Sequence, residues 1–94
     1  MQVRWLRAAL RNLREEFDYI AAENPAAAMI VVKRIQAAVA LLTDNPALGR
    51  PGRVTGTREL VAPSTRYLIP YRVRNERIEI LRVFHTSRKP PQHW

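Results

Sequence analysis

The sequence of 94 residues contains no cysteine. It therefore cannot form disulfides, a thiol nucleophile or a cysteine-ligated zinc site, which fits a reducing compartment. Its two histidines have no neighbouring cluster of metal-ligating side chains, so we expect no metal and no cofactor. No apolar run approaches the roughly 18 to 20 residues that span a bilayer, and the opening MQVRWLRAAL lacks the apolar stretch of a signal peptide. We expect a cytoplasmic protein with no membrane partner.

Common catalytic signatures are also missing. The sequence has no P-loop, no GxGxxG, no HExxH and no GxSxG motif. Its two serines fall in a predicted turn and in the C-terminal segment, which leaves a hydrolase triad without evident partners. These absences exclude most nucleotide-binding, metalloprotease and serine hydrolase classes.

The positive charge is concentrated in the second half of the chain. The whole sequence carries 16 Lys and Arg against 8 Asp and Glu, a net charge of +8. Residues 1–49 hold 6 basic and 5 acidic side chains, whereas residues 50–94 hold 10 basic and 3 acidic ones. Nine of those ten are arginine, the side chain that makes planar bidentate contacts with phosphates and carboxylates. The pattern predicts an anionic partner, either nucleic acid or an acidic protein.

Two helices are predicted in the first half. Leu6, Leu10, Leu13, Phe17 and Ile20 recur at helical spacing and indicate an amphipathic helix that starts near Leu6. Asn-Pro at 24–25 is typical of a helix start, and Asn-Pro at 45–46 of a helix end. Between them an apolar stripe predicts a second helix, antiparallel to the first. The stripe consists of Ala28, Val31, Ile35, Val39 and Leu42.

Strands are predicted at both ends of this hairpin. Residues 2–5 favour a short strand, residues 47–56 hold all three glycines and predict a basic loop, and 57–61, 67–73 and 77–84 alternate as strands. Pro70 cannot donate to a sheet ladder, so we expect a bulge or an unpaired amide position there. The order β-α-α-β-β-β predicts an α+β fold with a helical hairpin on a small, mostly antiparallel sheet. At this length it predicts one domain, 1–94, with 87–94 as a C-terminal tail.

A basic constellation on the predicted sheet allows two interpretations. Its members could clamp an RNA backbone, with His85 as an acid or base for cleavage beside a 2′-hydroxyl. Alternatively Arg72 and Arg82 lie over apolar surface with their guanidinium groups in water, and His85 packs under the tail. In that interpretation Arg74 and Arg77 are solvated residues of the turn between two strands. The constellation consists of Arg50, Arg53, Arg58, Arg66, Arg72, Arg82, His85 and Arg88.

Other candidate side chains have a functional and a structural reading. Glu59 is either a general base or one partner of a surface ion pair with a neighbouring arginine, and the ion pair is the favoured interpretation. Tyr67 and Tyr71 lie on the same strand face. They either stack on a nucleic-acid base or pack in the core, and packing in the core is the favoured interpretation. Trp5 is predicted in the core, and Trp94 either docks on the domain or anchors a partner.

Four phrases of the sequence, taken in order, are informative together. They are ALRNLREEFDYIAAENPAAA at 9–28, LLTDNPALGRPGRVTGTRELV at 41–61, YLIPYRV at 67–73 and IEILRVFHTSRKPPQHW at 78–94. In this order they resemble the RelE/ParE superfamily of toxins from bacterial toxin–antitoxin pairs, most closely ParE. The resemblance covers nearly the whole chain and implies the fold predicted above. RelE-like members cleave messenger RNA on the ribosome, whereas ParE-like members inhibit DNA gyrase without doing chemistry.

The C-terminal residues favour the ParE branch. RelE-like nucleases carry a tyrosine or a His-Tyr pair near the C-terminus, but here Thr86 follows His85 and no tyrosine follows Tyr71. The segment RVFHTSRKPPQHW is similar to a ParE ending. The resemblance therefore implies a non-enzymatic gyrase inhibitor that arrests growth by blocking replication, with a RelE-like endoribonuclease using Arg72, Arg82 and His85 as the alternative. The gyrase-contact candidates are Arg82, His85, Arg88, Lys89, His93 and Trp94.

The resemblance also implies a cognate antitoxin, whose acidic segment would wrap the toxin and neutralise it. The charge of +7 on residues 50–94 supports an acidic partner independently. We expect that segment in a groove between helices and sheet, and we expect no sequence-specific nucleic-acid binding by the toxin alone. A basic adaptor without toxicity is the remaining class. The antitoxin-binding candidates are Arg53, Arg58, Arg66, Tyr67, Tyr71 and Arg72.

Overall fold

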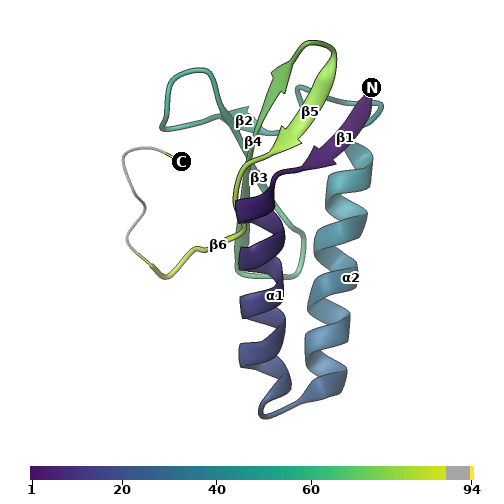
Figure 1. The fold of residues 1–94 in the computed structure, drawn as a ribbon, viewed down its shortest axis with the longest axis vertical. Coiled ribbons are helices and arrows are strands. Elements are labelled where there is room, and N and C mark those ends of the chain that lie inside the picture. Colours follow the sequence, from purple (N-terminus) through teal and green to yellow (C-terminus); the bar gives the residue numbers. More distant parts are fainter. Residues whose placement is uncertain (89–93) are drawn as a thin grey trace.

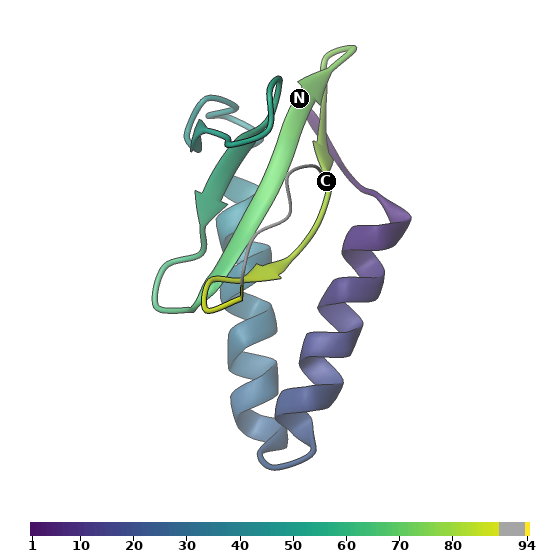
Figure 2. The same ribbon diagram turned by 90° about the vertical axis from the view of Figure 1, so that its left-hand side faces the viewer.

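The computed structural model describes residues 1–88 and Trp94, and it confirms the predicted α+β fold. Two antiparallel helices cover one face of a sheet, and their distal turns extend beyond it (Figures 1 and 2). We call the opposite side of the sheet the outer face. The elements are β1 (Gln2–Trp5), α1 (Arg7–Ala21), α2 (Pro25–Leu41), β2 (Arg50–Pro51), β3 (Arg58–Val61), β4 (Tyr67–Arg74), β5 (Arg77–Ile80) and β6 (Phe84–His85).

Both helices begin where the sequence predicts. Leu6 precedes α1 with extended backbone and no side-chain cap, whereas Asn24 caps α2 by accepting a hydrogen bond from the Ala27 amide at 3.0 Å. Pro25 occupies the first turn of α2, where its missing N–H costs nothing. The second helix ends at Leu41, earlier than Asn45 and Pro46 predict, because the chain turns through residues 42–44.

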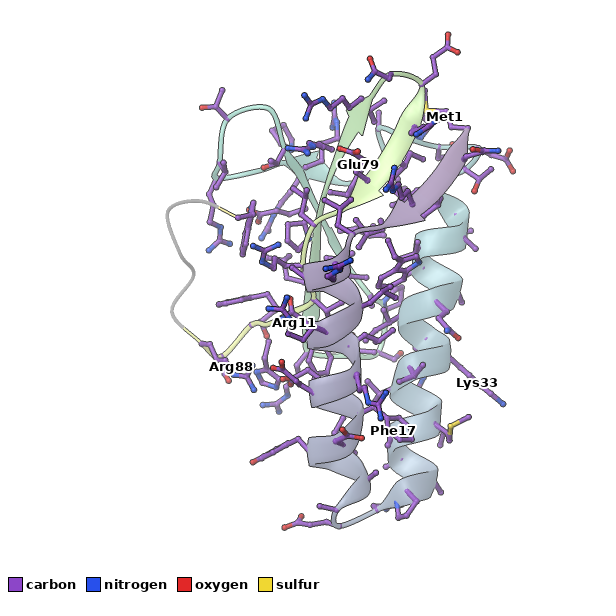
Figure 3. The ribbon with its side chains drawn as sticks, viewed as in Figure 1. Met1, Arg11, Phe17, Lys33, Glu79 and Arg88 are labelled. Carbon is purple, nitrogen blue, oxygen red and sulfur yellow. The ribbon has the colours of Figure 1, made fainter. Side chains whose placement is uncertain are left out.

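The apolar stripe predicted for α2 faces the core, but the stripe of α1 does so only in part. Ile35 and Leu42 of α2 are fully buried. On α1 the buried positions are Ala9 and Glu16, whereas Leu10 is 51% exposed. Leu10 instead lines a surface hollow between the helices with Phe17, which Figure 3 labels. The side of α1 that meets the sheet is therefore rotated by about one residue from the predicted stripe.

The sheet has the strand order β1-β5-β4-β3-β2, with β6 paired to β4. β1 runs parallel to β5, and the other pairs are antiparallel. Asn75 and Glu76 both adopt positive φ in the two-residue turn between β4 and β5. This is the backbone that a tight hairpin requires, and asparagine tolerates it better than most residues. The short strand β2 lies inside the segment 47–56, which the sequence predicts as loop only.

The predicted strand 77–84 is wrong as a continuous element, because it is broken by a bulge beside Pro70. Tyr71 pairs with Ile80 and Leu68 pairs with Phe84, so three steps on β4 oppose four on the other strand. The Leu81 amide donates to the Pro70 carbonyl at 2.9 Å, but proline cannot return the bond. The expected bulge at Pro70 is thereby confirmed, with its extra residue on the strand that faces Pro70.

Candidate functional site

A buried carboxylate on α1 joins three parts of the chain. Glu16 Oε1 accepts a hydrogen bond from the Tyr67 hydroxyl of β4 at 2.8 Å. The Arg88 guanidinium, after β6, donates to both carboxylate oxygens of Glu16 at 3.1 and 3.2 Å. Burial, followed by the bond to Glu16, raises the pKa of Tyr67 far above its ordinary value, so its hydroxyl stays protonated. The bond to Glu16 likewise raises the pKa of Arg88. This cluster connects α1 to the C-terminal segment.

His85 is held by its neighbours on β4 and in the following turn. Its ring meets that of Tyr67 edge-on, with centroids 5.2 Å apart. The Ser87 amide donates to His85 Nδ1 at 3.2 Å, and Ser87 Oγ lies 2.6 Å from the same nitrogen. Because an amide can only donate, Nδ1 acts as an acceptor there, and a proton on the neutral ring resides on Nε2.

A groove of about 510 Å³ separates the helices from the sheet at this cluster. We call it the helix–sheet groove. Its wall combines half-buried Ile20 and Val31 with the exposed Arg66 and Tyr19, which is 76% exposed. Such a mixture suits a chain segment that carries both apolar and acidic side chains. The lining residues are Glu16, Tyr19, Ile20, Val31, Ser64, Thr65, Arg66, Tyr67, His85, Ser87 and Arg88.

Glu59 on β3 is the second buried carboxylate. The predicted ion pair with a neighbouring arginine is confirmed, but Glu59 is buried and does not lie at the surface. Its side chain is 2% exposed and accepts from the Arg53 amide at 3.0 Å and from the Arg53 guanidinium at 3.0 and 3.2 Å. Arg50 adds a longer contact of 3.4 Å. Burial acts to raise the pKa of Glu59, but the bonds from Arg53 outweigh it and lower the pKa below the ordinary value. Glu59 thus folds the basic loop onto β3 and leaves no basic lone pair exposed for catalysis.

The lowered pKa of Glu59 predicts a stability that is lost in acid. A carboxyl whose folded pKa is depressed stabilises the fold above its unfolded pKa of about 4.5 and stops doing so as the pH falls through the folded pKa. We expect Glu59→Gln to lower the free energy of unfolding by about 2 kcal/mol at pH 7. Urea unfolding of both proteins should show that gap closing below pH 4.5. Glu23→Gln, at an exposed position, is the control, and a gap independent of pH would contradict the assignment.

Tyr71 is fully buried, which removes it from the antitoxin candidates as a contact residue. Its hydroxyl donates to the Pro46 carbonyl at 2.7 Å and accepts from the Gly49 amide at 2.8 Å. Tyr71 therefore fastens the start of the basic loop to the sheet. The prediction that Tyr67 and Tyr71 pack in the core is confirmed.

The outer face carries a second hollow, of about 490 Å³, which we call the outer hollow. Arg72 lies at its edge and bonds Glu79 through Nε at 2.6 Å, a contact that holds the pKa of that carboxyl below its usual range. Arg82 donates to the backbone oxygens of Leu81 and Trp94, each at 2.7 Å. Trp94 stacks edge-on against Phe84, with centroids 5.6 Å apart. Of the two readings for Trp94, docking on the domain is the one observed.

The three residues of the alternative nuclease site do not meet. Side chains alternate along β4, so Arg72 points to the outer face while Tyr67, five positions earlier, points to the helices. His85 pairs with Tyr67 and lines the helix–sheet groove, whereas Arg72 and Arg82 line the outer hollow. A general acid or base must reach the same bond as its electrostatic partners, and this arrangement separates them by the thickness of the sheet.

The other candidates occupy both sides of the sheet. Arg66 is exposed in the helix–sheet groove. Arg58 bonds the Gly49 carbonyl at 2.7 Å and so helps to fasten the loop. Lys89 and His93 lie outside the described residues. In the part of the chain that the structure describes, no three metal-ligating side chains gather, and neither helix has the length and apolar character of a bilayer span.

Residues 3–90 match the family model described as ParE toxin of type II toxin-antitoxin system, parDE. The chain belongs to the ParE toxin family. It is 47% identical over 91 residues to Y4kP, a predicted toxin of Sinorhizobium fredii (strain NBRC 101917 / NGR234), covering 97% of this chain and 94% of that protein. It also resembles a solved structure of the chromosomal ParDE toxin–antitoxin system from P. aeruginosa, with a TM-score of 0.81, 32% identity, and coverage of 90% of this chain and 95% of that one.

For this ParE-family chain, the structure adds two residues on α1 that the sequence did not single out. Glu16 holds Arg88, and Asn12, one turn earlier, accepts from the Val83 amide at 3.2 Å in the bulged segment. A signal for Glu16 was available, because it continues the spacing of Ala9, Leu13 and Ile20, the residues that face the core. An acidic side chain on the apolar stripe of a helix indicates a buried partner.

Proposed function

We propose that this ParE-family toxin inhibits DNA gyrase in the cytoplasm, blocks replication without catalysing a reaction, and is neutralised by a cognate antitoxin. The observation that carries the proposal is the separation of Arg72 and His85 on opposite sides of the sheet. It favours the gyrase branch over the nuclease branch within a superfamily that contains both. The match of residues 3–90 to the ParE family model supports the same choice.

The C-terminal segment is the proposed gyrase contact. Arg88 is bonded to Glu16 and Trp94 to Arg82, so these two described residues of the segment are held against the body of the toxin. Contact residues that are held in place before binding lose less entropy on binding than free ones. Half of the Arg88 side chain, 53%, stays exposed and available to a partner. His85 and Trp94 complete the proposed contact with Lys89 and His93.

The helix–sheet groove is the proposed antitoxin site. Arg66 is exposed at its rim, and Tyr19 and Ile20 add apolar surface, so an acidic segment with apolar side chains would find complements for both. Arg53 is bonded to Glu59, Arg58 to the Gly49 carbonyl, and Arg72 to Glu79. These three would contribute mainly long-range attraction, which speeds association more than it adds affinity.

The experiment is a supercoiling assay with purified toxin, DNA gyrase, relaxed plasmid and ATP, run beside a ribosome-bound messenger RNA cleavage reaction. We expect supercoiling to be lost, or linear plasmid to accumulate, while the message stays intact. Prior addition of the cognate antitoxin should restore supercoiling. Normal supercoiling with cut message would overturn the proposal in favour of the endoribonuclease, and normal supercoiling with intact message would favour a non-toxic adaptor.

A further inference from the structure

The outer face of the sheet gathers four arginines around Glu79. Arg72 and Arg74 on β4 and Arg77 on β5 share this face with Glu79, because their register partners alternate with the buried Ile78 and Ile80. Arg4 on β1 stands opposite Glu79 in the neighbouring pair. We call Arg4, Arg72, Arg74 and Arg77 the arginine cluster. Figure 3 shows Glu79 among side chains near the end of the β4–β5 hairpin.

Repulsion within the arginine cluster destabilises the fold. Arg74 and Arg77 are direct cross-strand partners, and like charges in that position are destabilising. The positive charges of Arg72, Arg74 and Arg4 all help to hold the pKa of Glu79 low, which places them within electrostatic range of one carboxylate. One acid cannot neutralise four arginines. An anion on this face would relieve the repulsion.

The chemistry of the face favours a phosphodiester backbone over an acidic peptide. Arg72 and Arg74 line the outer hollow with the loop residues Thr55 and Thr57, and guanidinium groups are donors only. A phosphodiester offers acceptors alone, so it pairs fully with such a lining. A peptide brings one N–H per residue that needs an acceptor, and the Glu79 carboxylate already accepts from Arg72. All four members are arginine, whose planar fork matches a phosphate bidentately.

We propose that the arginine cluster binds the phosphate backbone of nucleic acid independently of base sequence. The helices leave this face uncovered, so a strand can lie across β4 and β5 (Figures 1 and 2). The site is separate from the helix–sheet groove proposed for the antitoxin. It does not depend on gyrase inhibition and adds a second anionic partner to the toxin.

The test is fluorescence anisotropy with labelled DNA duplex, single-stranded DNA and RNA of one sequence, titrated with free toxin at several salt concentrations. We expect binding that weakens steeply with salt. The variant Arg74→Gln/Arg77→Gln should raise Kd about tenfold at about 0.1 M salt and reduce the salt slope by roughly 2. The tighter of the three probes identifies the natural source of the phosphate. Because no gyrase is present, this result is independent of the supercoiling assay.

Matched controls separate the cluster from total charge. Arg14→Gln/Lys33→Gln removes the same charge from exposed helix positions, and Figure 3 shows Lys33 on the far side of α2 from Glu79. We expect this variant to change Kd less than about twofold, and the Arg74→Gln/Arg77→Gln variant to melt no lower than the parent. Equal losses in both variants, no binding by the parent protein up to about 100 µM, or preferential binding of poly-glutamate would each overturn the proposal.

Discussion

The substitution Glu16→Ala is expected to lower the free energy of unfolding by about 2 kcal/mol and to loosen the C-terminal segment. It removes the acceptor of the buried Tyr67 hydroxyl and the partner of Arg88. The Tyr67 hydroxyl then bears the cost of an unsatisfied buried donor, whereas half-exposed Arg88 returns to water. For a chain of this size the thermal midpoint should fall by about 8 to 16 °C. Circular dichroism melting measures it directly.

A second variant separates stability from positioning. Glu16→Ala/Tyr67→Phe removes donor and acceptor together, so much of the lost stability should return while Arg88 stays unclamped. If the clamp positions the gyrase contact, this folded variant should still inhibit supercoiling less than the parent protein. Glu15→Ala removes the neighbouring, exposed acid and should change neither property. A double variant as unstable as Glu16→Ala would contradict the role assigned to the Tyr67 bond.

The substitution Gly49→Ala is expected to lower the free energy of unfolding by about 3 kcal/mol, because the added methyl group has no room. Its carbon would lie 2.6 Å from Tyr71 Cε1, 2.8 Å from the Tyr71 hydroxyl oxygen and 2.9 Å from the Glu59 carbonyl oxygen. The tyrosine ring is fully buried and cannot turn away, and the carbonyl belongs to β3. Relief requires the loop to move, which breaks the bonds of Tyr71 to Gly49 and Pro46.

Urea unfolding checks this prediction with two companions. Leu48→Ala changes the exposed neighbour and should shift stability by less than about 0.5 kcal/mol. Tyr71→Phe keeps the ring but leaves the Gly49 amide without its hydrogen-bond acceptor. We expect it to lower the free energy of unfolding by about 1 to 2 kcal/mol, a smaller loss than for Gly49→Ala. A Gly49→Ala protein as stable as the parent would show that the loop has room to shift.

Local sequence predicted the elements whose cause is local. The spacing of Ile35, Val39 and Leu42 specifies one buried helix face, and Asn24 with Pro25 marks the start of that helix. The turn between β4 and β5 also has a local cause, because asparagine at position 75 tolerates the positive φ that the turn requires. Pro70 predicted a bulge because proline lacks the amide N–H that donates to the neighbouring strand. In each case the deciding factor is an interaction between residues close together in the chain or a property of one residue.

Burial of charge was decided by tertiary contacts. Neither Glu16 nor Glu59 is predicted to be buried, yet both are, because Arg88 neutralises Glu16 and Arg53 neutralises Glu59. The parallel pairing of β1 with β5 joins the two ends of the chain. A local sequence pattern does not show how close two such segments lie in the fold. The free energy of burying a charged side chain depends on that distance, because a nearby opposite charge offsets the loss of water.

The sequence by itself determined the family, the helical hairpin, the short strands and a basic second half; the tertiary structure decided which side each functional residue faces. The bulge beside Pro70 shows the physical reason. If the register of Tyr71 with Ile80 continued without the extra residue, His85 would face the same side of the sheet as Arg72, whereas with it His85 pairs with Tyr67 and faces the helices. A strand shifted by one residue presents its side chains on the opposite face, so one inserted residue separates the histidine from the arginines.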